Sequence, residues 1–318
     1  MEIEEYKISK IPKGKNSFRL LYIPTPTLKK KLQSHLSYLQ YKNLELDEHR
    51  TCHAFLKGRN CVTNALQHVG YNYCVSMDIK DFFDSVRPHH VENKVSREVI
   101  QDCFIDGAPR QGLPTSPLLS NLALLDADAK IIEFLNQFRV VHRYTRYADD
   151  ISISFDDERA TGRIIFIVNS VLESYGFSVN QKKTKIQSKE NGRIIITGIA
   201  IDKNGLFPTR KTKRKIRAAY HQKNISSVRG LEEWAKCKLP NNTPKNPKRF
   251  IRIVGKTLVS CMHCNQSNLI WAEQYPGRTF LVNSESGSRH KCKFLNAILS
   301  QRDLMTQLKK WGTRTSFL

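Results

Sequence analysis

Cysteines, long apolar runs and acidic residues are all scarce in this 318-residue chain, and each scarcity removes a class of protein. Eight cysteines are too few for a disulfide-stapled secreted domain, so we expect reduced thiols and a cytoplasmic location. The sequence holds no run of about 18 apolar residues, which argues against a membrane-spanning helix. Its first residues, Met1 to Glu5, are acidic and lack an apolar stretch, so no secretory signal is expected.

The shortage of acidic residues gives the chain a large positive charge. Asp and Glu number 29 against 52 Lys and Arg, for a formal net charge of +23 at pH 7. Such a surplus indicates a polyanionic partner, usually nucleic acid, with anionic membrane as the alternative. We expect no membrane partner, because neither end carries a basic amphipathic anchor.

The positive charge is concentrated in the last third of the chain. Between Lys203 and Lys256 there are 16 Lys and Arg but only two acidic residues, Glu232 and Glu233. A solvated helix face would explain one basic run such as 210–217. A basic stretch of this length favours a nucleic-acid groove. We therefore place a domain boundary near residue 203, which separates residues 1–203 from a basic region, 204–318.

The hydrophobic pattern predicts an α+β fold. Strands are expected at 18–24, 73–77, 140–147, 151–155 and 194–196, and helices at 28–43, from 116 onward and at 161–175. Ser116 and Pro117 suit a helix start, and Leu118, Leu122 and Leu125 then recur at helical spacing. After an N-terminal hairpin with a basic turn at 12–16, this order is typical of a ferredoxin-like split βαβ unit.

Three aspartates are placed where metal chemistry would need them. Asp78 ends a predicted strand, and Asp149 and Asp150 lie 71 residues later in a turn between two predicted strands. Phosphoryl transfer from a nucleoside triphosphate uses two divalent ions, and Mg²⁺ prefers carboxylate oxygens. An Asp-Asp pair alone is more often an ordinary exposed turn, so the second acidic strand end is what favours a metal site.

The order of these segments resembles the palm motifs of reverse transcriptases over residues 15–205. The matching segments are Met77 to Phe83, Gln111-Gly112, Ser116-Pro117 with Asn121, Tyr147 to Asp150, and Gly176-Phe177 with Asn180 and Lys183-Thr184. The resemblance implies a right-hand polymerase with fingers, a ferredoxin-like palm and a mostly helical basic thumb, which synthesises DNA on an RNA template. The alternative is a catalytically inert RNA-binding scaffold with a palm fold. The presence of all three aspartates argues against this alternative.

The resemblance also assigns roles in metal and nucleotide binding. It implies that Asp78, Asp149 and Asp150 bind two Mg²⁺ ions, with the carbonyl of Ile79 as an additional ligand. Phe83 occupies the place of the aromatic residue that stacks under the sugar and selects dNTPs. Without the motif, Phe83 would be interpreted as a core residue.

Further residues resemble those that contact the incoming nucleotide. Gln111 and Gly112 match the loop beneath the nucleotide and template. Lys183 matches a lysine near the pyrophosphate, with Lys182 as its competitor. Lys15 and Arg19, on the predicted N-terminal hairpin, are similar to fingers residues that neutralise the triphosphate.

Two finer patterns are similar to bacterial retron reverse transcriptases. Residues 64–68 match the pattern Asn-Ala-x-x-His, and Ile196-Thr197-Gly198 is similar to a Val-Thr-Gly motif. A retron enzyme would bind a structured noncoding RNA (msr-msd) and start from a guanosine 2′-hydroxyl. It would make multicopy single-stranded DNA (msDNA) as a branched RNA–DNA product, in an anti-phage system with a separate effector protein. Other prokaryotic reverse transcriptases, of the diversity-generating or small group II intron type, remain as alternatives.

A cluster near the C-terminus has some of the spacing of a zinc site. Its residues are Cys261, Cys264, His290 and Cys292. Tetrahedral Zn²⁺ accepts four such ligands, but the gap between Cys264 and His290 is longer than in common zinc modules. The alternative is that these are reduced, unpaired cysteines in a thumb helix.

Overall fold

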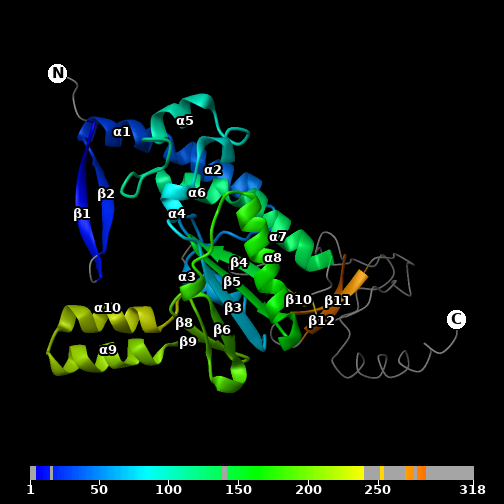
Figure 1. Cartoon of the computed structure of the whole chain (residues 1–318). Coiled ribbons are helices and arrows are strands. Elements are labelled where there is room, and N and C mark those ends of the chain that lie inside the picture. The colour runs from blue at the N-terminus through cyan, green and yellow to red at the C-terminus, as the bar shows by residue number, and fades with distance from the viewer. Residues whose placement is uncertain are drawn as a thin grey trace, which may run out of the picture. The chain divides into compact units, whose positions relative to one another are not determined.

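The computed structural model describes residues 5–14, 17–137, 142–239, 251–253, 269–274 and 278–283 (Figure 1). The chain divides into two compact units, residues 1–242 and 243–318, and each is described by itself. The functional boundary expected near residue 203 lies inside the first unit, in a turn between two strands of a small sheet.

The first unit begins with a hairpin and two helices, which correspond to the expected fingers. Strands β1 (Tyr6–Gly14) and β2 (Ser17–Pro24) pair antiparallel and lead into α1 (Pro26–Ser34) and α2 (Leu36–Leu46). The Thr25 hydroxyl caps α1 by accepting from the Leu28 amide. One helix was predicted at 28–43, but the chain breaks it at His35, whose ring bonds to Asp102 at 2.9 Å.

The palm sheet has the ferredoxin-like order β4-β5-β3-β6, and all neighbours are antiparallel. Its strands are β3 (Tyr73–Asp78), β4 (His142–Tyr147), β5 (Asp150–Phe155) and β6 (Lys185–Ser188). Helices α6 (Ser116–Ala123) and α7 (Leu125–Gln137) connect β3 to β4, and α8 (Thr161–Ser174) connects β5 to β6. The expected α+β palm is therefore confirmed.

One predicted strand exists but belongs to a different sheet than expected. The strand predicted at 194–196 exists as β7 (Ile194–Ile196), but it belongs to a second sheet with β8 (Ile199–Asp202) and β9 (Gly205–Pro208). The fourth palm strand is instead β6, an edge strand of four residues that no apolar alternation marks. A strand exposed at a sheet edge needs little hydrophobic patterning, so no periodicity in these four residues predicts it.

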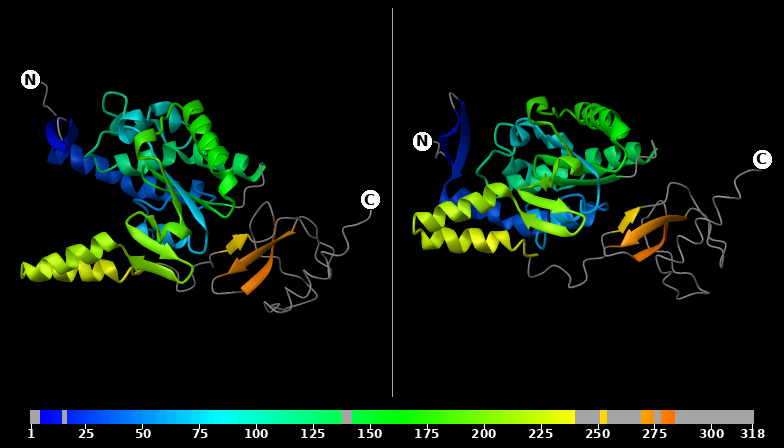
Figure 2. Two further views of the ribbon diagram at one scale, coloured as in Figure 1. Left: turned by 60° about the horizontal axis from the view of Figure 1, so that its bottom comes forward. Right: turned by 90° about the horizontal axis from the view of Figure 1, so that it is seen from below.

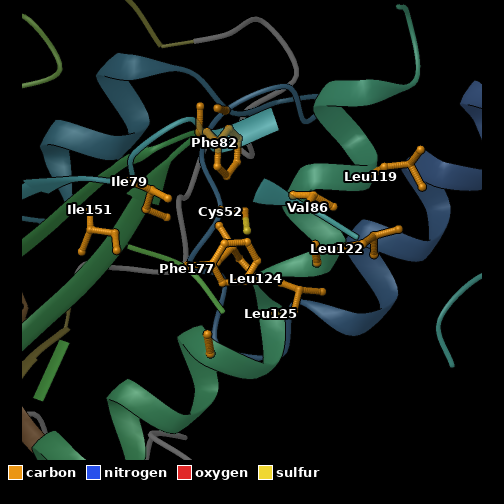
Figure 3. Packing of buried hydrophobic residues seen from close by; sticks show 14 of the residues in the cluster. Cys52, Ile79, Phe82, Val86, Leu119, Leu122, Leu124, Leu125, Ile151 and Phe177 are labelled. Carbon is orange, nitrogen blue, oxygen red and sulfur yellow. The ribbon is translucent and has the colours of Figure 1, made fainter. Parts of the chain in front are cut away.

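The core of the first unit lies between the palm sheet and helices α6 and α7. Figure 3 shows Ile79 and Ile151 on one side of it, Phe177 near its centre and Leu122 on the helical side, all at most 2% exposed. Interiors are packed as densely as organic crystals, so this core holds the strand ends in fixed positions. Truncating one of its leucines to alanine would cost about 2–5 kcal/mol of stability.

The small sheet leads into a pair of helices within the expected basic region. Helix α3 (Cys61–Leu66) packs against this sheet, with Ile194, Ile196, Ile199 and Ile201 buried between them. Helices α9 (Arg210–His221) and α10 (Ile225–Ala235) then run side by side (Figure 2). Two short helices, α4 (Phe82–Ser85) and α5 (Arg97–Cys103), complete this unit's described α-helices.

The second unit is described through one antiparallel sheet. Its strands are β10 (Ile251–Ile253), β11 (Leu269–Gln274) and β12 (Arg278–Asn283). Among the described residues after 203, the helices of the expected thumb are α9 and α10. The cysteine and histidine cluster, Cys261, Cys264, His290 and Cys292, lies outside the described residues, so its zinc assignment stays a prediction. Across the helices that are described, none has the length and apolarity to cross a lipid bilayer.

Candidate active site

The register of two strand pairs brings the aspartates together. Asp78 lies directly opposite Asp150 in the β3–β5 pair, and Tyr147 lies opposite Asp150 in the β4–β5 pair. Opposed residues of antiparallel strands have Cα atoms about 4.5–5.5 Å apart. Asp149 occupies the turn between β4 and β5, and its carbonyl accepts from the Ile79 amide at 3.0 Å. Three carboxylates from two strand ends therefore converge on one point.

The carboxylates crowd one another, and the pKa values reflect this. Burial raises the pKa of Asp149, and the charge of Asp78 raises it further. Desolvation of its carboxyl group, followed by the charges of Asp149 and Asp78, raises the pKa of Asp150 to about 6. Like charges brought together in a partly desolvated site repel, and this repulsion falls when a cation binds between them.

One lysine partly compensates this negative charge. The Lys183 ammonium donates to both carboxylate oxygens of Asp78 at 2.9 Å, and this bonding raises the pKa of Lys183. The loop that carries Lys183 is fixed to β3, because the Asn180 amide donates to the Asp78 carbonyl at 2.7 Å. Of the two candidate lysines, the structure brings Lys183 to the aspartates.

The donor set fits hard divalent cations. Asp78, Asp149 and Asp150 supply only oxygen atoms, and the single ammonium of Lys183 leaves the cluster with net negative charge. Mg²⁺ takes one or two carboxylates and keeps several waters, and it adds substrate phosphates as ligands. The arrangement therefore suits magnesium bound together with a nucleoside triphosphate.

The strain in this cluster has a measurable consequence for stability. Because the folded-state pKa of Asp150 is about 6 and its ordinary value is 3.8, ionising it opposes folding above pH 6. This cost shrinks as the pH falls toward 4 and vanishes below it. Replacing Asp150→Asn in magnesium-free buffer should raise stability at pH 7.5 by about 1 kcal/mol, after allowance for solvent screening.

Thermal denaturation in EDTA between pH 4 and 7.5 checks this expectation. The melting temperature of Asp150→Asn should exceed that of the wild type at pH 7.5 and match it near pH 4. Asp157→Asn is the control, because Asp157 forms an ion pair with Arg159 at 3.0 Å. Its negative charge is therefore favourable in the folded protein. An Asp150→Asn protein that melts at or below the wild-type temperature at pH 7.5 would contradict the account.

The Gln111-Gly112 loop contacts strand β2 of the fingers hairpin. The Tyr22 amide of β2 donates to the Gln111 carbonyl at 2.8 Å. Gly112 has φ +109°, and a Cβ there would lie 2.4 Å from the Tyr22 carbonyl oxygen and 2.9 Å from the Leu21 side chain. Only glycine allows both this backbone conformation and this close approach.

The other predicted residues are distributed around the carboxylates. Arg19 lies on β2, and its positive charge acts on the Asp149 carboxyl group. Phe83, in α4, is half-buried and packs against Phe82 with ring centroids 5.2 Å apart. Ile79 is buried, with 2% exposure. Lys15 lies outside the described residues.

Sequence reasoning missed the buried residue that supports the aspartate turn. Arg146 is fully buried in β4 and forms an ion pair with Asp128 of α7 at 2.8 Å. Its guanidinium also donates to the side chain of Asn121 and to the carbonyl of Ala148, both at 3.1 Å. Nothing in the sequence marks this arginine, because its partners lie on separate segments.

The two retron-like patterns contact each other and brace the palm. Asn64 donates to the Thr197 hydroxyl at 3.5 Å, so residues 64–68 and 196–198 meet at the small sheet. His68 is buried between Ser154 and Thr145, with ring nitrogens 2.9 and 2.6 Å from their hydroxyls. Burial lowers the pKa of His68 to about 3, so it is a neutral structural residue that links β4 and β5.

Sequence comparison places the chain among known proteins. The family model for reverse transcriptase (RNA-dependent DNA polymerase) matches residues 11–218. The chain belongs to the reverse transcriptase family. The retron Mx65 reverse transcriptase of Myxococcus xanthus is 30% identical over 247 residues, covering 69% of this chain and 56% of that protein. The retron Ec73 reverse transcriptase of Escherichia coli is 32% identical over 216 residues, covering 60% of this chain and 67% of that protein.

Among solved structures, the fold is similar to that of a telomerase. Apo telomerase from Candida tropicalis superposes with a TM-score of 0.50 at 14% identity, covering 66% of this chain and 49% of that one. At this identity the match shows a shared reverse transcriptase fold. The chain spans little more than half the length of the Mx65 relative.

Proposed function

We propose that this chain is a retron-type reverse transcriptase that copies RNA into DNA from dNTPs. The observation that carries the proposal is the convergence of Asp78, Asp149 and Asp150 at the paired ends of β3 and β5. A polymerase needs carboxylates that are held rigidly at one point, and this sheet register supplies them. A catalytically inert scaffold would have no reason to keep three like charges at a cost in stability.

The chain's residues have separable roles in the proposed reaction. Two magnesium ions, when bound, would stabilise the attacking and leaving oxygens of an in-line displacement at the α-phosphorus. Asp78, Asp149 and Asp150 would hold the two magnesium ions in place. Lys183, which bonds to Asp78 in the free protein, would turn toward the pyrophosphate when the metal ions and nucleotide are bound. Arg19 offers positive charge from the fingers side.

The helical pair α9–α10 is the proposed binding surface for the RNA partner. Six cations on α9 are exposed, and no ion pair to any of them occurs in the described part of the chain; they are Arg210, Lys211, Lys213, Arg214, Lys215 and Arg217. Tyr220 donates to Glu232 of α10 at 2.6 Å, which ties the two helices together. Unpaired cations in such a row attract phosphates of a structured RNA.

The retron assignment rests on the curated relatives and on the contact between residues 64–68 and 196–198. It includes a cognate noncoding RNA (msr-msd), msDNA as the product, a bacterial cytoplasmic setting and a defence role with a separate effector. Sequencing the nucleic acid that co-purifies with the protein tests it. The expected result is one structured RNA joined to single-stranded DNA of complementary sequence. Random cellular RNA with no attached DNA would contradict it.

Phe83 is the proposed residue for selecting dNTPs over rNTPs. Phe83 follows the end of β3 at Asp78 by five residues and its ring is half-buried, and from that position we propose that it excludes a ribose 2′-hydroxyl. Replacing Phe83→Ala should increase rNTP incorporation relative to dNTP incorporation by roughly 10–200-fold, the range of a hydrophobic pocket change. Competition between radiolabelled rNTP and dNTP in primer extension measures this ratio.

Phe82→Leu is the matched control for Phe83. Phe82 is 5% exposed and faces the core, so this substitution should lower stability and leave the sugar preference unchanged. Equal effects of both substitutions on the rNTP to dNTP ratio would assign Phe83 to core packing alone.

A further inference from the structure

We infer that Arg146, together with Asp128, positions the catalytic turn, and that the buried Arg146 side chain sets the orientation of Asp149. Neither residue contacts the proposed substrates, so both are positioning residues. The inference rests on the proposed function, because it concerns the geometry of the same carboxylates.

The Arg146 guanidinium is saturated with hydrogen bonds inside the protein. Its Nε and Nη2 donate to Asp128 at 2.8–3.0 Å, and Nη1 donates to the Asn121 side chain. Nη2 also reaches the Asn121 carbonyl at 3.1 Å and the Cys52 sulfur at 2.9 Å. Arginine has five N–H donors in a rigid fork, so this set of acceptors fixes the plane of the side chain.

One further bond from this fork reaches the turn itself. Nη1 donates to the Ala148 carbonyl at 3.1 Å, and Ala148 has φ 58°, a left-handed conformation that is unfavourable for a residue with a Cβ. The Ala148 carbonyl belongs to the peptide group that precedes Asp149. The peptide group that follows Asp149 is fixed by the bond from the Ile79 amide. Both peptide planes beside Asp149 are therefore held, one of them by Arg146.

The backbone of Arg146 is anchored as firmly as its side chain. Its amide donates to the Thr51 carbonyl at 2.9 Å, and its carbonyl accepts from the His53 amide at 2.8 Å. This parallel bridge joins β4 to the segment around Cys52. The support beneath the turn thus extends to α6, α7 and residues 51–53, all of which belong to the core.

Stability alone does not account for this buried ion pair. Replacing a buried pair by apolar or neutral groups of similar size is often neutral or stabilising, because desolvation offsets the attraction. The turn, in contrast, carries two mutually repelling carboxylates, which push it away from the geometry that a metal requires. A rigid cation-anchored bond to Ala148 opposes that distortion, and a methylene chain cannot replace it.

The test separates a loss of positioning from a loss of folding. Arg146→Met combined with Asp128→Asn removes both charges, and the asparagine oxygen still accepts from the Tyr144 hydroxyl, which bonds to Asp128 at 2.6 Å. Tyr144→Phe is the matched control, because it removes a bond in the same network without touching Ala148. Mn²⁺ affinity, followed by electron paramagnetic resonance, and single-nucleotide primer extension are measured on each protein, alongside the melting temperature.

The double variant should bind Mn²⁺ about 10–100-fold more weakly than the wild type, as for other residues that orient metal ligands. Its kcat should fall while its KM for dNTP stays within a few-fold. Tyr144→Phe should melt at a lower temperature but keep wild-type Mn²⁺ affinity. If the double variant does not fold, Arg146→Lys takes its place, since lysine keeps the ion pair but cannot also reach Ala148.

Two results would overturn the inference. One is wild-type Mn²⁺ affinity in the folded double variant or in Arg146→Lys. The other is an equal loss of affinity in Tyr144→Phe, which would assign the effect to general stability. Failure of the proposed function is distinguishable from both, because the wild type itself would then neither bind Mn²⁺ at the aspartates nor extend a primer.

Discussion

Primer extension should be lost when Asp149 and Asp150 are both replaced by asparagine. The substitution keeps the size and polarity of the side chains and removes two of the three negative charges. Metal-assisted charge stabilisation contributes several kcal/mol to such a reaction, so a loss of about 10³-fold or more is expected. Radiolabelled dNTP incorporation on an RNA template measures it, and binding of the RNA should remain near the wild-type level.

The chain provides a matched control at the other end of the same strand. Asp156 and Asp157 follow β5 directly, as a second pair of adjacent aspartates far from the Asp78 strand end. Their replacement by asparagine removes the same charge and should leave incorporation within a few-fold of the wild type. Unchanged incorporation in the Asp149 and Asp150 variant would exclude these aspartates from catalysis.

The second large effect is expected at Gly112, where the fingers hairpin meets the palm loop. Alanine there would place a Cβ 2.4 Å from the Tyr22 carbonyl oxygen, so the loop and β2 must move apart. The bond from the Tyr22 amide to the Gln111 carbonyl would break with this movement. Because the fingers would no longer be docked, incorporation should fall about 10²-fold, as after a displacement of about 1 Å in a catalytic site.

Gly107→Ala separates the two sources of this effect. Gly107 also has a positive φ, +71°, but a Cβ there meets nothing within 4 Å. This variant therefore carries the conformational cost of about 1 kcal/mol without the clash. It should lower the melting temperature slightly and leave incorporation near the wild-type level. Equal incorporation by the Gly112 and Gly107 variants would show that the close approach to Tyr22 does not affect incorporation.

The sequence predicted those parts of the fold that short-range patterns control. Alternating and helical apolar spacing gave the strands that end at Asp78 and flank Asp149, and the helix that begins at Ser116. The long helix expected after Ser116 is two helices that meet at Leu124. Its apolar stripe continues across this break, which is why periodicity alone did not reveal it.

Long-range contacts could not be predicted in the same way. Arg146 is 18 residues from Asp128 and 94 from Cys52, and no spacing rule connects them. The edge strand β6 gains its place by pairing with β3, so its own four residues carry little signal. The register that sets Asp78 opposite Asp150 also arises only when β3 and β5 pair. The sequence indicated the candidate residues, and the fold shows how they are held.

The most direct test of the account is a crystal structure of the protein grown with Mn²⁺, a dNTP and a primed RNA template. Anomalous scattering locates the manganese without ambiguity. The account predicts two peaks about 3.5–4 Å apart that lie within bonding distance of Asp78, Asp149 and Asp150, with Lys183 released from Asp78. Manganese bound elsewhere, with the bond between Lys183 and Asp78 intact beneath the nucleotide, would contradict it.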